Sequence, residues 1–142
     1  MTIQPTWWLI GLLSGSDMAY QITWKEDAVV FTFYGELDID EVHKASGTLH
    51  GDARFDELKY VIANFLEADL KKIEMTQIEE HAAIDYAASM SVPRIKVALI
   101  AKDFSSSAEK CTRYIEESKR FGSPWEIRIF SSLEDADAWG NS

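Results

Sequence analysis

The stretch Gly35-Glu36-Leu37-Asp38 decides the fold, because the hydrophobic period changes across it from that of a strand to that of a helix. Before it, Val29, Phe31 and Phe33 alternate with their neighbours at the period of two expected of a half-buried strand. After it, Asp38 and Glu41 form a capping-box pattern, in which each side chain can accept a hydrogen bond from the backbone of the other. The chain is therefore predicted to leave a strand and enter a helix here.

Further strands are predicted on both sides of this junction. Alternating residues at 20–24 and 28–34, separated by a polar turn, predict an antiparallel hairpin. Two nearly continuous apolar runs at 60–65 and 95–101 are typical of strands covered on both faces, as in a parallel sheet. A final alternation at 125–129 predicts the last strand.

Four helices are predicted between and after these strands, because each segment opens with a capping pair and closes with a glycine or proline. The pairs are Asp38 with Glu41, Thr76 with Glu79, Ser106 with Glu109, and Ser131 with Glu134. The segments close at Gly47 or Gly51, before Pro93, at Gly122 with Pro124, and at Gly140. The second helix is expected to turn an apolar stripe inward: Ile78, Ala82, Ala83, Tyr86, Ala87 and Met90.

The predicted order of elements is ββαβαβαβα, an α/β fold in which helices cover a mixed sheet. A chain of 142 residues with 46% apolar and 27% charged residues fits one domain with its own core, predicted over residues 19–140. Residues 1–18 are interpreted as an N-terminal extension, and Met18 is a candidate natural start that would make residues 1–17 an upstream addition.

The extension contains the apolar run Trp7-Trp8-Leu9-Ile10-Gly11-Leu12-Leu13, which is far shorter than the roughly 20 residues needed to span a bilayer. No Lys or Arg precedes the run, as the start of a secretory signal would require. We therefore expect no membrane span. The run could pack on the domain, pair with another copy or insert shallowly at an interface. We expect packing or homo-oligomerisation, because no basic residues accompany the run.

Charge and cysteine content narrow the functional classes. A net charge of −10 and a pI near 4.7 oppose binding to the phosphate backbone, so a nucleic-acid partner is not expected. The lone Cys111 cannot form an intrachain disulfide, and its position within a helical stripe predicts a small buried hydrophobe. This cysteine usage fits a reducing compartment, and we expect a cytoplasmic protein.

Three stretches, taken with the order of elements, carry a family resemblance. They are Gly35-Glu36-Leu37-Asp38, Tyr60-Val61-Ile62-Ala63-Asn64 and the closing Phe130-Ser131-Ser132-Leu133-Glu134-Asp135-Ala136-Asp137-Ala138-Trp139. Together with the acidic loop before Thr76, they resemble the SpoIIAA-like branch of the STAS superfamily, the fold of bacterial anti-sigma factor antagonists. The resemblance covers residues 19–139. It implies a regulatory domain that binds another protein and catalyses no reaction.

The chain departs from this family at the phosphorylation motif. Phosphoregulated members open the second helix with Asp-Ser-Ser/Thr-Gly, whose first serine accepts the phosphoryl group, whereas this chain has Glu74-Met75-Thr76-Gln77. By this alignment Met75 occupies the acceptor place, and a thioether cannot accept a phosphoryl group. The resemblance therefore implies that the usual switch is absent. Thr76 is a possible substitute acceptor, and its role as a helix cap explains it without modification.

Other catalytic and metal-binding patterns are weak. His81 and Asp85 are four residues apart, a spacing that could hold two metal ligands, and His43 and His50 are two helical turns apart. Because no third ligand is indicated, we interpret these residues as parts of solvated helix faces and expect no metal and no cofactor. The sequence contains no glycine-rich phosphate loop and no nucleophile elbow.

The best candidate interaction surface is the rim beyond the carboxyl ends of the parallel strands, where binding sites of such sheets collect. Two predicted helix amino termini, at Thr76 and Ser106, direct unpaired amides there. The candidate rim residues are Asp69, Glu74, Met75, Thr76, Asp103, Ser105 and Ser106.

The leading functional hypothesis is a protein-interaction or regulatory domain with an unknown protein partner. The alternative is the binding of an apolar small molecule or lipid between the sheet and a mobile helix, because SpoIIAA-like folds resemble lipid-binding CRAL-TRIO domains. A deep pocket lined by Tyr86, Met90, Tyr114 and Ile115 would favour the ligand. A flat rim with an exposed Met75 would favour a protein partner.

Overall fold

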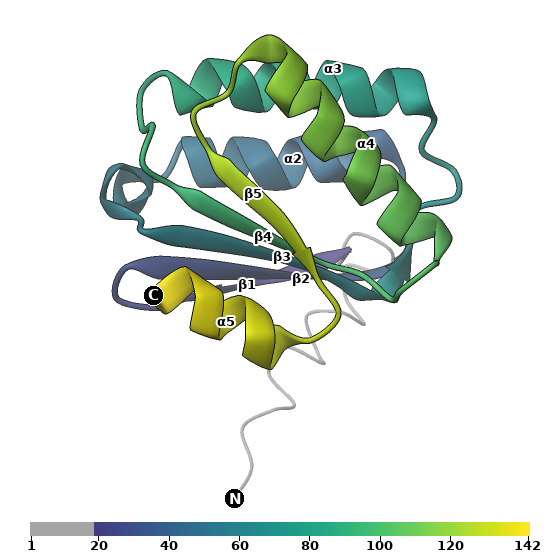
Figure 1. Cartoon of the computed structure of the whole chain (residues 1–142), viewed down its shortest axis with the longest axis horizontal. Coiled ribbons are helices and arrows are strands. Elements are labelled where there is room, and N and C mark those ends of the chain that lie inside the picture. Colours follow the sequence, from purple (N-terminus) through teal and green to yellow (C-terminus); the bar gives the residue numbers. More distant parts are fainter. Residues whose placement is uncertain (1–18) are drawn as a thin grey trace, which may run out of the picture.

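The chain folds around a five-stranded mixed sheet, which the computed structural model describes within residues 19–142 (Figure 1). The strands lie side by side in the order in which they occur in the sequence. The first pair is antiparallel and every later pair is parallel, as the hairpin and the apolar runs predicted. The strands are β1 (Tyr20–Trp24), β2 (Ala28–Glu36), β3 (Tyr60–Asp69), β4 (Lys96–Ile100) and β5 (Glu126–Phe130).

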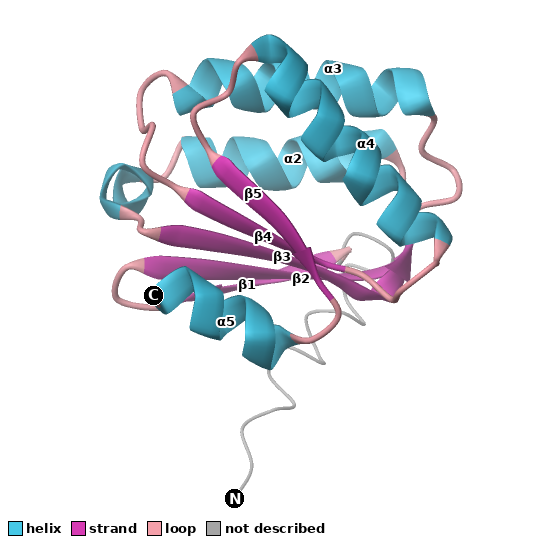
Figure 2. Cartoon of the chain, viewed as in Figure 1, coloured by secondary structure: helices cyan, strands magenta, loops and turns pink. Residues whose placement is uncertain are grey.

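Helices cover both faces of the sheet (Figure 2). Three of them, α2 (Ile39–His50), α3 (Met75–Ser89) and α4 (Ser106–Phe121), form a layer on one face, and α5 (Leu133–Asn141) lies alone on the other. The predicted order ββαβαβαβα is therefore confirmed. A short 3₁₀ helix, η2 (Ala53–Glu57), was not predicted and links α2 to β3.

The capping residues of three helices, α3, α4 and α5, differ from those predicted. At α2 the expected box is present, because Asp38 Oδ1 accepts from the Glu41 amide and Glu41 Oε1 accepts from the Asp38 amide, each at 3.0 Å. At α3 the cap is Glu74, paired with Gln77, so Thr76 lies inside the first turn and the prediction that Thr76 caps the helix is wrong. Glu74 is the last residue with extended backbone, and only such a residue can take the cap position.

The caps of the two later helices each differ by one residue from the prediction, in opposite directions. Ser105, not Ser106, caps α4 and accepts from the Ala108 amide at 3.0 Å. Ser132, not Ser131, caps α5 and accepts from the Asp135 amide at 3.2 Å. Neighbouring serines offer equivalent side chains, so the backbone conformation decides between them.

Glycines end two of the helices as expected. Gly51, the later of the two predicted ends, is the C-cap of α2. Gly122 follows α4 with φ of 84°, a left-handed conformation that glycine adopts without steric cost.

The face under α5 is a small, closely packed core. Tyr60 is 1% exposed, and its hydroxyl donates to Asp137 at 2.7 Å. Gly140 lies so close that an added Cβ would stand 2.3 Å from the Tyr60 ring. The other buried apolar residues of this core are Ala28, Val30, Ile62, Ala98, Ile100 and Ala136.

The described part of the chain contains no helix that is both long and apolar enough to cross a membrane. The predictions for the extension, for a start at Met18 and for homo-oligomerisation through residues 1–17 concern residues outside the described range.

Candidate functional site

The inner face of α3 is mixed: Ile78 and Ala82 of the predicted apolar stripe are buried, together with polar residues that were not expected there. Its buried residues are Ile78, His81, Ala82, Asp85 and Ser89. His81 is 6% exposed and Asp85 is 8% exposed, so the interpretation of both as solvated residues is wrong. Met90, assigned to the stripe, is 55% exposed. The polar residues can be buried because side chains from α2 and α4 satisfy most of their hydrogen-bonding groups.

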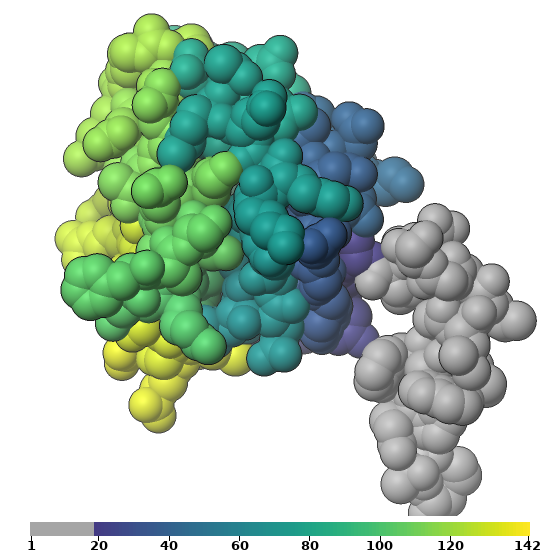
Figure 3. Space-filling model, turned by 90° about the vertical axis from the view of Figure 1, so that its right-hand side faces the viewer, coloured from purple at the N-terminus to yellow at the C-terminus, as the bar shows by residue number. Residues whose placement is uncertain are grey.

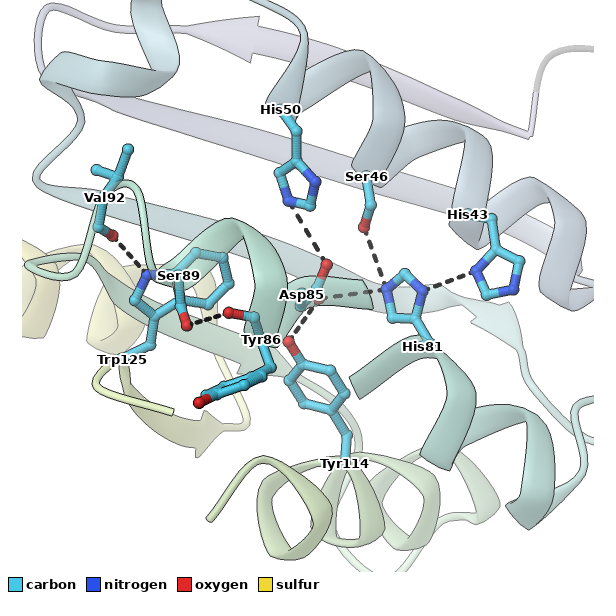
Figure 4. Close-up of polar contacts among 10 residues, drawn as sticks. All are labelled: His43, Ser46, His50, His81, Asp85, Tyr86, Ser89, Val92, Tyr114 and Trp125. Carbon is cyan, nitrogen blue, oxygen red and sulfur yellow. Dashed lines mark hydrogen bonds and ion pairs between the residues drawn. The ribbon is translucent and has the colours of Figure 1, made fainter. Parts of the chain in front are cut away.

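His81 lies at the centre of a polar cluster between the helices (Figure 4). Its Nδ1 lies 2.9 Å from Nδ1 of His43 on α2. Its Nε2 lies 3.1 Å from the Ser46 hydroxyl and 3.3 Å from Asp85 Oδ2. Because one nitrogen of a hydrogen-bonded imidazole pair must accept, the contact between His43 and His81 requires at least one neutral ring.

The Asp85 carboxylate is satisfied on one oxygen only. Oδ2 accepts from the Tyr114 hydroxyl of α4 at 2.6 Å. Oδ1 is buried and has no hydrogen-bond partner among the described residues. Nε2 of His50 lies 3.5 Å from Oδ1 and does not form a hydrogen bond with it. An unsatisfied buried acceptor of this kind costs about 1–3 kcal/mol, more for a charged group.

The cluster shifts the ionisation of its members. Burial raises the pKa of Asp85, but the positive charge and hydrogen bond of His81, with the hydrogen bond from Tyr114, lower it below its ordinary value on balance. Burial lowers the pKa of His50 more than Asp85 raises it. Burial and the neighbouring His81 lower the pKa of His43. The neutral forms of His43 and His50 and the ionised form of Asp85 are therefore favoured.

Ser46, His81 and Asp85 do not form a catalytic triad. In a triad the serine and the carboxylate contact opposite nitrogens of the histidine, so that one nitrogen takes a proton while the other is held. Here the Ser46 hydroxyl and Asp85 Oδ2 both approach Nε2 of His81. This arrangement fixes the orientation of the His81 ring. It does not let the ring take a proton from Ser46 on one nitrogen while Asp85 holds the other. The residues from 19 to 142 contain no group of three or more side chains placed to hold a metal ion.

A cavity of about 100 Å³ lies next to the cluster, between the sheet and the three-helix layer. For scale, an engineered apolar cavity of about 150 Å³ binds benzene. Its walls are mostly apolar, and the polar cluster forms one side. The sheet side is lined by Phe31, Phe33, Val61, Ala63, Phe65, Val97 and Leu99, and the polar side by Ser46, His50, His81, Asp85 and Tyr114.

The cavity differs from the pocket expected from the sequence. Tyr114 lines it, but Tyr86, Met90 and Ile115 do not. Tyr86 points away and stacks on Phe121, with ring centroids 5.9 Å apart. Cys111 also lines the cavity and is buried as predicted, and burial raises the pKa of its thiol to about 12. The cavity therefore lies between the sheet and the inner faces of the helices and does not reach Tyr86, Met90 and Ile115.

None of the residues proposed for the rim lines the cavity. They belong to the edge where the parallel strands end, and this edge of the molecule faces the viewer in Figure 3. There Asp69 ends β3, Glu74 and the half-buried Met75 begin α3, and Ser105 caps α4. Lys110 donates a hydrogen bond to the Ile73 carbonyl and so links the two helix starts. The exposed residues include Thr76, Asp103 and Ser106. The role of this rim in recognition, and of Thr76 as a phosphoacceptor, stays a prediction.

Phe104 is an unexpected feature of the rim. It is fully exposed at 103% and has φ of 61°, a left-handed conformation that is uncommon for residues other than glycine. The segment between β4 and α4 thus holds an aromatic ring in solvent. The sequence offered no signal for this, because Phe104 could equally have packed into the core.

Four members of the polar cluster, His43, His50, His81 and Asp85, were interpreted from the sequence as solvated, and Ser46 was not named as a candidate. His43, Ser46 and His50 share one face of α2, at spacings of three and four residues, and His81 and Asp85 share one face of α3. Polar residues gathered on one face of each helix could have indicated that the two faces pack against each other. The contribution of Tyr114 could not be found in the same way, because a tyrosine in a helical stripe is usually a core residue.

Comparison with known proteins supports the fold. No protein-family model matches the chain, and no curated protein matches its sequence. An uncharacterised protein of the DUF3478 family from Shewanella loihica PV-4, which has a SpoIIAA-like fold, is 17% identical, with a TM-score of 0.53 over 85% of this chain and 91% of that one. The anti-sigma factor antagonist SpoIIAA in its unphosphorylated form is 16% identical, with a TM-score of 0.51 over 87% of this chain and 96% of that one. The chain therefore has the SpoIIAA-like fold.

Proposed function

We propose that this chain is a non-enzymatic domain of SpoIIAA-like fold that binds a small, mostly apolar molecule between its sheet and its three-helix layer. The observation that carries the proposal is the cavity of about 100 Å³ beside a buried carboxylate with one unpartnered oxygen. Natural cores are packed with few voids larger than a water molecule, so a space of this size bordered by an unsatisfied polar atom indicates a site.

The three-helix layer offers a route into the cavity beside α2. Only Ala45 and Leu49 of this helix are buried. Ile39, Val42, Ser46 and His50 line the cavity and are only half-buried. A molecule larger than the present volume would enter by displacing α2, the helix with the fewest buried anchors.

The test is to isolate the full chain from its native cells and to extract and identify bound small molecules by mass spectrometry. Ala63→Leu places extra carbons in the cavity, and Ala87→Leu, at an exposed position on α3, is the matched control. We expect one compound in near-stoichiometric amount with the native chain and with Ala87→Leu. We expect about tenfold less compound with Ala63→Leu, because the added carbons occupy the space that the compound would fill.

The proposal fails if no compound accompanies the native chain, or if folded Ala63→Leu retains as much of it. Far-ultraviolet circular dichroism and denaturant unfolding establish that the variant is folded. If Ala63→Leu does not fold, Ala45→Leu fills the same cavity from α2.

A second candidate function is the binding of a protein partner at the rim, and the exposed Phe104 favours it. An aromatic side chain held in solvent is typical of an interface anchor. The test is affinity isolation of the native chain and of Phe104→Gly from native cells, with the amount of each co-purified protein compared between the two. Glycine suits the left-handed backbone, so stability should stay within about 0.5 kcal/mol while a rim partner is lost. Equal recovery of the partner with both chains would exclude this role for Phe104.

A further inference from the structure

The chemistry of the cavity indicates which head group its ligand carries. Asp85 Oδ1 is the buried side-chain oxygen without a hydrogen-bond partner among the described residues, and its carboxylate lines the cavity. The other oxygen, Oδ2, is already engaged by Tyr114 at 2.6 Å and approached by His81 at 3.3 Å. A bound molecule can therefore complete the site only with a hydrogen-bond donor.

The surrounding groups favour a cationic donor. The pKa of Asp85 lies below its ordinary value, so the carboxylate is ionised at neutral pH. Hydrogen bonds from a cation to a carboxylate are shorter and about twice as strong as neutral ones. A carboxylate ligand would instead place a second negative charge beside Asp85, in an environment that screens charges poorly.

The other polar groups facing Asp85 do not supply this donor. His50 on α2 stands 3.5 Å from Oδ1, and the pKa of this histidine is lowered by burial, so it is mostly neutral. Lys110 on α4 also lines the cavity, but its ammonium donates to the Ile73 carbonyl. Trp125 donates its indole N–H to the Val92 carbonyl at 2.7 Å. Oδ1 therefore has no hydrogen-bond donor among the described residues.

We propose that the cavity selects small molecules with an apolar body and one protonated amine, which donates a hydrogen bond to Asp85 Oδ1, and that it rejects molecules ending in a carboxylate. This inference rests on the proposed function and specifies the class of ligand. The amine head would lie against Asp85, and the carbon chain would extend along the sheet past Ala63 and Leu99.

The test uses three probes of matched size: n-butylamine, 1-butanol and butanoate, each titrated into the full chain at neutral pH and followed by NMR chemical shifts. We expect butylamine to bind about tenfold or more tightly than butanol, the factor of a charge-assisted over a neutral hydrogen bond. We expect no saturable shift from butanoate. Nuclear Overhauser contacts should place the amine methylene next to the Tyr114 and His81 rings.

Two variants test whether the charge of Asp85 causes the preference for butylamine over butanol. Asp85→Asn keeps the shape of the side chain and removes its charge, and should weaken butylamine about tenfold while leaving butanol within about threefold. Glu116→Gln removes one negative charge from an exposed position on α4 and should change neither affinity. If Asp85→Asn does not fold, the affinities of the three probes for the native chain and their nuclear Overhauser contacts test the assignment of the amine to Asp85.

The possible failures are distinguishable. Binding of butanoate as tightly as butylamine, or equal loss of butylamine affinity in both variants, overturns the assignment of the amine. If all three probes bind alike at the cavity, the ligand site stands and only the head-group inference is wrong. If no probe binds and xenon under pressure also fails to enter, the proposed function fails as well.

Discussion

Under the sheet, α5 sets Gly140 directly against the Tyr60 ring, whereas the three helices on the opposite face leave a cavity of about 100 Å³. The buried residues under α5 are apolar apart from the tyrosine hydroxyl, which is paired with Asp137. The opposite face buries a carboxylate with an unpartnered oxygen. One sheet thus has a filled face, which stabilises the fold, and a face with space and unused hydrogen-bonding capacity, which suits binding.

The largest expected effect is that of Gly140→Ala on the filled face. An added Cβ would stand 2.3–2.7 Å from three Tyr60 ring atoms, and the buried, hydrogen-bonded ring cannot swing away. We expect a loss of about 1–3 kcal/mol in the free energy of unfolding, measured by denaturant titration. Gly47→Ala in α2 is the control, because nothing lies within 4 Å of its Cβ, and it should stabilise the helix by up to about 1 kcal/mol. Equal stability of Gly140→Ala and the native chain would contradict close packing under α5.

The second prediction compares one substitution on the two faces. Ala98 is fully buried on the filled face, and Ala63 on the neighbouring strand lines the cavity. Ala98→Leu should cost about 1–3 kcal/mol through overpacking, whereas Ala63→Leu should cost less than about 1 kcal/mol because space is present. Thermal or denaturant unfolding measures both. An equal penalty at the two positions would mean that the cavity side is as full as the other.

A third prediction removes one tyrosine hydroxyl from each face. Tyr114→Phe leaves the buried Asp85 carboxylate without its shortest hydrogen bond, at an expected cost of about 1–3 kcal/mol. Tyr60→Phe removes a hydrogen bond to the partly exposed Asp137, at an expected cost of about 1 kcal/mol. Denaturant unfolding of both variants measures the difference between the two losses in the free energy of unfolding. A larger loss for Tyr60→Phe would show that the buried Asp85 carboxylate depends less on the Tyr114 hydroxyl than its burial implies.

The smallest expected effect is the pH dependence of the free energy of unfolding. The pKa values of His43 and His50 in the folded chain lie below the ordinary 6.5, so the unfolded chain binds protons more readily between the folded values and 6.5. The free energy of unfolding should therefore fall as the pH is lowered from about 6.5 toward the folded-state pKa values of the two histidines. The lowered pKa of Asp85 acts only below its ordinary 3.8, outside this window. Replacing both histidines by glutamine should flatten the profile, and a flat native profile would show that these histidines are not perturbed.

The sequence predicted those features that depend on neighbouring residues. The Asp38 and Glu41 capping box and the apolar runs of β3 and β4 are local patterns, and the structure contains them. The caps of α3 and α4 were placed one or two residues late, because several side chains could serve and the backbone chose among them.

The candidate site depends on contacts that no local pattern records. Asp85 is buried because Tyr114, 29 residues later, donates to it. The polar face of α3 therefore became an inner face, where periodicity alone favoured the alanines. The cavity is what remains after three helices pack on the sheet, and its volume follows from their separation. Sequence patterns predicted the layers but not the space between them.

The most direct test of the difference between the two faces is a crystal structure of the full chain under xenon pressure, since xenon binds in apolar cavities. We predict a xenon atom between the sheet and the three-helix layer, in contact with Ala63 or Leu99, and none under α5. A structure with no xenon beside the three-helix layer, or with xenon also under α5, would contradict the account.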